Sequence, residues 1–115
     1  ASMIVTEAAA VTPEGRISPH DAGIWNDEQV AGWRRVNDFV HGLGAGVTTA
    51  VQLAHAGRKA STWSPFSGHR GSVPTDAGGW TTVAPSAVAF EGFAEPVALD
   101  TAGIDRIVEA FGAAG

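Results

Sequence analysis

Two kinds of apolar periodicity divide the first half of the chain into strand, helix and strand. Residues 3–5 are β-forming, and residues 7–11 lead out of that strand. Asn26 is expected to cap a helix, because apolar residues recur behind it every three or four positions. These apolar positions are Val30, Trp33, Val36, Val40 and Leu43. Gly44 suits the position that ends this helix, and residues 47–53 are predicted to form the next strand.

This order predicts an α/β fold, because the connecting helix is long enough for the two strands to pair in parallel. Residues 61–99 then form a long excursion, with short extended segments expected at 81–84 and 87–90. Loops beyond about 15 residues are usually functional. Asp100 is expected to cap a second amphipathic helix that begins near Thr101.

Composition and charge narrow the function classes. The chain has 115 residues, of which 44% are hydrophobic and 17% charged, as in folded proteins. Its net charge is −5 without a basic stripe, which argues against nucleic-acid binding. It contains no cysteine, and no apolar run is long enough for a transmembrane helix. The first residues lack the features of a signal peptide, so we expect a cytoplasmic protein that binds no membrane.

Polar side chains crowd the end of the second predicted strand. Gln52, His55, Arg58 and Lys59 follow one another where a buried strand would carry aliphatic residues. Binding sites of α/β folds lie at the carboxyl ends of their strands. Two interpretations are equally open from residue types: a site for an anionic or amide-bearing ligand, or residues that satisfy one another and the backbone.

The end of the first strand carries small residues instead. If the strands are parallel, residues 7–10 lie on the same edge as Gln52, and Ala8 would let a flat ligand approach the backbone. A tightly packed junction explains the same residues. The histidines, at positions 20, 41, 55 and 69, show no metal-ligand spacing, and no metal site is predicted.

At these residues the sequence resembles the Old Yellow Enzyme family of FMN-dependent ene-reductases, in particular its bacterial xenobiotic-reductase-like subgroup. The resemblance rests on residues 5–8 with 11–17, residues 21–25 and the run from Gln52 to Ala60. Residues 84–87 are also typical of the subgroup. The matching blocks span roughly residues 3–90 in the family's order.

The resemblance implies a (β/α)8 TIM barrel with FMN across its mouth, of which this chain is about two βα units with a long capping loop at 61–99. By similarity, Ala8 contacts the flavin through its backbone and Gln52 binds the pyrimidine edge of the ring. Arg58 and Lys59 match a basic pair near the flavin, whereas His55 matches a structural position. NAD(P)H would serve as reductant and an activated alkene, such as an α,β-unsaturated carbonyl compound, as substrate.

The resemblance also implies that residues 1–115 are one fragment of a single barrel domain. No catalytic residue is assigned within these residues, because the family's proton donor is a tyrosine and the chain has none. A complete barrel needs about 250 residues, so most of it lies outside this fragment. We expect the isolated chain to be inactive and the full-length enzyme to be a homo-oligomer. Two alternatives stay open: a dienoyl-CoA-reductase-like relative with FMN and an iron–sulfur cluster, and a non-catalytic α/β fragment.

Overall fold

The computed structural model describes residues 2–115 and contains the predicted strand, helix and strand in order. Its helices and strands are β1 (Met3–Ala10), α1 (Asp27–Gly42), β2 (Thr48–Ala54), β3 (Val83–Ala84), β4 (Val97–Ala98) and α2 (Thr101–Ala114). Short 3-10 turns are η1 (Pro13–Gly15), η2 (Gly57–Lys59) and η3 (Thr75–Ala77). We call residues 11–26 the first loop and residues 61–99 the excursion. No helix among residues 2–115 is both long and apolar enough to cross a membrane.

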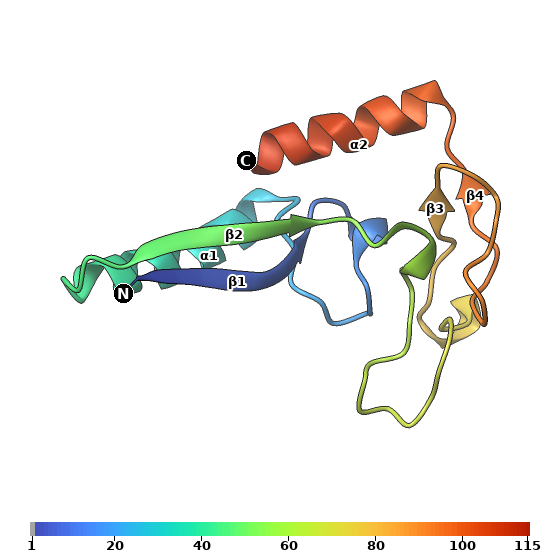
Figure 1. Ribbon diagram of the computed structural model, residues 1–115, viewed down its shortest axis with the longest axis horizontal. Coiled ribbons are helices and arrows are strands. Elements are labelled where there is room, and N and C mark those ends of the chain that lie inside the picture. Colours follow the sequence, from blue (N-terminus) through green and yellow to red (C-terminus); the bar gives the residue numbers. More distant parts are fainter. Residues whose placement is uncertain (1) are drawn as a thin grey trace.

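Strands β1 and β2 pair in parallel, which confirms the predicted topology. Figure 1 shows them side by side with α1 alongside, and the first loop and excursion gathered beyond their carboxyl ends. Asn26 caps α1 as predicted, since its side-chain oxygen accepts a hydrogen bond from the backbone N–H of Gln29. Asp100 caps α2 in the same way, accepting from the N–H of Gly103.

Of the two short extended segments expected in the excursion, the one at 81–84 contains β3, whereas the one at 87–90 forms no strand. Residues 87–90 are exposed and form no ladder, and β3 pairs instead with β4. The local β-propensity of Val88 and Phe90 does not suffice, because a strand forms only where another strand pairs with it. The carbonyl of Val88 instead accepts a hydrogen bond from Arg58.

The tight core lies at the carboxyl ends of the strands rather than under α1. The buried apolar residues are Ala9, Ala10, Val11, Ala60, Val73 and Ala84. Helix α1 has no fully buried residue, and its predicted apolar face is largely open: Val36 is 53% and Leu43 64% exposed. Trp33, which periodicity places in the core, is half-buried.

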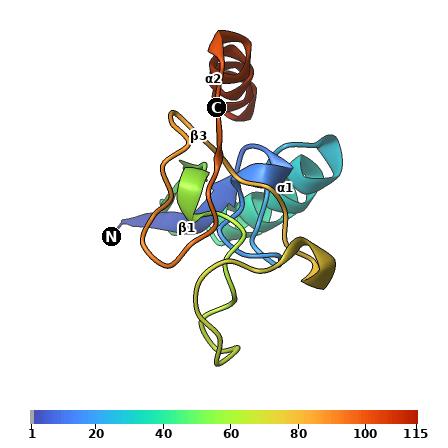
Figure 2. The same ribbon diagram turned by 90° about the vertical axis from the view of Figure 1, so that its right-hand side faces the viewer.

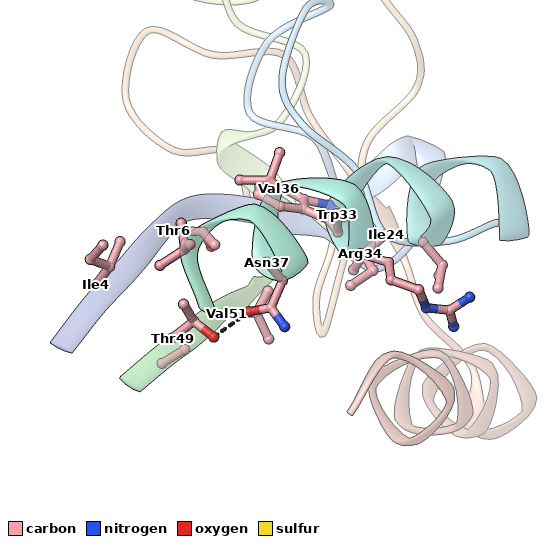
Figure 3. Close-up of a pocket in the computed structure, with 12 residues that line it drawn as sticks. Ile4, Thr6, Ile24, Trp33, Arg34, Val36, Asn37, Thr49 and Val51 are labelled. Carbon is pink, nitrogen blue, oxygen red and sulfur yellow. Dashed lines mark hydrogen bonds between the residues drawn. The ribbon is translucent and has the colours of Figure 1, made fainter. Parts of the chain in front are cut away.

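An apolar groove of about 380 Å³ runs between α1 and the sheet. Figure 3 shows Ile4, Thr6, Thr49 and Val51 along the strands beneath the helix, with Thr49 hydrogen-bonded to Asn37. This hydrogen bond joins the helix to the sheet, while much of the apolar surface around it stays uncovered.

Candidate flavin-binding site

Ala8 and Gln52, which the sequence places on one edge, are direct partners in the parallel ladder. The register shifts by one residue between Val5 and Ala8, so β1 carries a bulge just before this pair. A bulge re-aims the side chains that follow it. Thr6 lies at this irregularity, and its hydroxyl oxygen accepts a hydrogen bond of 3.1 Å from the backbone N–H of Gln52. Sequence reasoning missed Thr6, because nothing in the local pattern signals a bulge.

The side chain of Gln52 is exposed and available to a ligand. Thr49 and Val51 face α1, and side chains alternate along a strand, so Gln52 projects from the opposite face. Within residues 2–115 its amide group makes no hydrogen bond. A primary amide offers one acceptor and two donors, a set that matches the alternating donors and acceptors of a flavin pyrimidine edge. The small side chain of Ala8 beside it leaves room for a flat ring, so these residues fit FMN.

Arg58 is held by the excursion. Its Nη1 donates to the carbonyl of Val88 at 2.5 Å, and its Nη2 donates to Ser86 Oγ at 3.1 Å. These hydrogen bonds engage Arg58 with a backbone carbonyl and a hydroxyl group rather than with a carboxylate. Arginine suits this role because its planar fork donates to two acceptors at once.

Lys59 points to the same part of the excursion. Its Nζ lies 4.0 Å from the centre of the Phe90 ring, within the range of a cation–π contact. The N–H groups of the ammonium that do not face the ring stay available to a ligand. Arg58 and Lys59 thus connect η2 to residues 86–90, beside the strand end that carries Gln52.

His55 is half-buried behind the strand end. Its Nδ1 accepts a hydrogen bond of 3.1 Å from the N–H of Gly57, and its ring packs on Gly15. Desolvation lowers the pKa of His55 below its ordinary 6.5, although the nearby Glu14 carboxylate opposes this. The neutral ring with its proton on Nε2 fits this geometry, and that buried Nε2 has no partner within residues 2–115. These contacts agree with a structural role.

These features define a class: a parallel α/β unit whose strand ends present an unpaired amide, a small-residue surface and positive charge. Such an edge can bind a flat, hydrogen-bonding, anionic ligand. Among residues 2–115, no group of three or more acidic, histidine or cysteine side chains is placed to hold a metal ion.

The whole chain, residues 1–115, matches the sequence profile of the NADH:flavin oxidoreductase / NADH oxidase family. The chain belongs to this family. It is 38% identical over 109 residues to an NADPH dehydrogenase of Halalkalibacterium halodurans, covering 95% of this chain and 27% of that relative. It is 53% identical over 60 residues to an NADPH dehydrogenase of Bacillus pumilus, covering 52% and 17% respectively.

Solved structures agree with this assignment. Morphinone reductase in complex with tetrahydroNAD is similar with a TM-score of 0.75 and 32% identity, over 97% of this chain and 32% of that one. The Old Yellow Enzyme homologue of Zymomonas mobilis gives a TM-score of 0.70 and 28% identity, over 97% and 30%. The resemblance to Old Yellow Enzymes is therefore confirmed, and FMN with NAD(P)H as reductant is the cofactor pair that the family implies. The chain spans less than a third of the length of each of these relatives.

Proposed function

We propose that these residues form part of the FMN site of an ene-reductase. The observation that carries the proposal is the unpaired amide of Gln52, placed by the β1 bulge and Thr6 beside Ala8 at the carboxyl edge of a parallel sheet. The chemistry that FMN supplies when bound is transfer of a hydride from NAD(P)H to the β-carbon of an activated alkene. Addition of a proton at the α-carbon completes the reduction.

The residues of this chain would bind and orient the flavin. Gln52 would hold the pyrimidine edge of the flavin, and the backbone at Ala8 would lie against the ring. Lys59, whose donors stay free, would supply positive charge near that edge. Arg58 acts mainly through the excursion, since both of its hydrogen bonds go there. An α,β-unsaturated carbonyl compound fits as substrate, because its carbonyl makes the β-carbon electrophilic.

The exposed apolar surface supports a larger barrel of which residues 1–115 are one part. Met3, Ile4 and Val5 in β1 are 64%, 50% and 53% exposed. In a TIM barrel, neighbouring strands would pair with the free edges, and further helices would cover the groove beside α1. We propose accordingly that the excursion caps the mouth of a single barrel domain.

The test uses the full-length protein that contains these residues, purified with added FMN and then desalted. A retained flavin band in the visible spectrum is expected, together with anaerobic bleaching by NADPH. Cyclohex-2-enone should then restore the oxidised spectrum, whereas cyclohexanone, which lacks the alkene, should not. Loss of the flavin on desalting would contradict the FMN site. If NADPH bleaches the flavin but the enone does not reoxidise it, the FMN site would stand and only the proposed ene-reduction would be contradicted.

A further inference from the structure

The guanidinium of Arg16 lies close to two indole rings. Its central carbon is 4.7 Å from the ring centre of Trp80 in the excursion and 5.6 Å from that of Trp25 in the first loop. Both distances allow a cation–π contact. Arg16 Nε donates to the carbonyl of Pro13 at 2.8 Å, and Nη1 donates to the carbonyl of Pro19 at 2.9 Å. The first loop therefore fixes the guanidinium on which Trp80 of the excursion packs.

The excursion is attached to the first loop around this stack. Trp80 Nε1 donates to the carbonyl of Glu14 at 2.9 Å, and the backbone N–H of Thr62 donates to the carbonyl of Ile17 at 2.8 Å. Ser61, only 1% exposed, accepts from the backbone N–H of Trp80 at 2.9 Å. The two ends of residues 62–80 are thus drawn together. Figures 1 and 2 both show the tip of this segment projecting away from the rest of the fold.

Beyond Trp80 the excursion packs against η2, the turn that follows β2. Strand β3 lies against η2, and residues 86–88 accept the two hydrogen bonds of Arg58. One arginine therefore holds this stretch at Trp80 and another holds it at Ser86 and Val88. A shift at the first contact would move the chain that the second contact holds against η2, which follows the strand end that carries Gln52.

We propose that Arg16 is a positioning residue for the flavin site: it holds Trp80 against the first loop and thereby fixes the excursion, with Arg58, over the strand end. This inference rests on the proposed FMN site. The guanidinium contacts two indole rings and also donates two hydrogen bonds to backbone carbonyls. Lysine carries a compact point charge and cannot reproduce this set of contacts.

The test compares full-length Arg16→Met and Arg16→Lys with a matched Arg35→Met control on the exposed side of α1. FMN affinity is measured by flavin fluorescence, and trypsin cleavage after the exposed Arg70 reports the excursion. Arg16→Met is expected to weaken FMN binding about 3- to 30-fold and to speed the cleavage. Arg16→Lys should fall between Arg16→Met and wild type, which keeps the test valid if Arg16→Met does not fold. Arg35→Met should match wild type.

A double-mutant cycle separates positioning from general stability. With Trp80→Leu, Arg16→Met should weaken FMN binding little further, because the stack is already lost. Independent, multiplicative losses would overturn the proposal. So would faster cleavage with unchanged FMN affinity in Arg16→Met, an outcome that leaves the proposed function intact. Wild-type protein that retains no FMN would overturn the proposed function and the positioning role with it.

Discussion

Gln52→Ala is the sharpest perturbation of the site, because the fold does not use this side chain. Its side-chain amide is exposed, and its contact with Thr6 is made through its backbone N–H. The substitution should leave the free energy of unfolding within about 0.5 kcal/mol of wild type, as for other surface changes. FMN binding should lose about 1–3 kcal/mol, because buried groups on the ring edge lose their partner. That is about a 5- to 150-fold higher dissociation constant.

The assay is flavin fluorescence titration of the full-length apoprotein, with thermal unfolding measured in parallel. Thr48→Ala is the matched control: Thr48 is exposed on the same face of β2, at the opposite end of the strand. Its FMN affinity should equal that of wild type. Equal affinity in Gln52→Ala would refute the role assigned to the amide. A large fall in stability for Gln52→Ala would refute the claim that the fold does not use it.

Three further predictions concern the full-length protein. Burial lowers the pKa of His55, so the unfolded state takes up a proton at a higher pH than the folded state does, and stability should fall as the pH drops below about 6.5. His55→Asn should make the thermal-unfolding temperature depend less on pH. An unchanged pH dependence in this variant would contradict the prediction. Gly79→Ala should destabilise the protein strongly, because a Cβ there would lie 1.9 Å from the carbonyl oxygen of Val73. Gly32→Ala, in open space on α1, should instead stabilise it by about 0.5–1 kcal/mol. Urea unfolding measures both changes, and similar effects of the two substitutions would refute the close approach of Gly79 to Val73. Arg58→Ala should release residues 86–88 and speed their exchange of amide hydrogens, with unaltered exchange as the contrary result.

Local rules located most of the elements in advance. Asn26 and Asp100 begin the helices because a short polar side chain can cap the first turn. The parallel pairing of β1 with β2 follows from the helix between them. The segment at 87–90 failed because strand formation depends on a partner, and the partner of β3 lies further along the chain.

The site was predictable in kind but not in detail. A polar cluster at a strand end indicated Gln52, and parallel pairing brought Ala8 beside it. The bulge and the contact from Thr6 depend on register, which no local pattern encodes. The excursion's contacts with Arg16 and Arg58 join residues far apart in sequence, so no local pattern predicts them.

The most direct test of the central claim is a crystal structure of the full-length protein with FMN. The Gln52 amide is expected to lie within about 2.7–3.2 Å of the donors and acceptors on the pyrimidine edge. The backbone at Ala8 should lie against the ring. An FMN ring bound elsewhere, with Gln52 in contact only with solvent or protein, would contradict it.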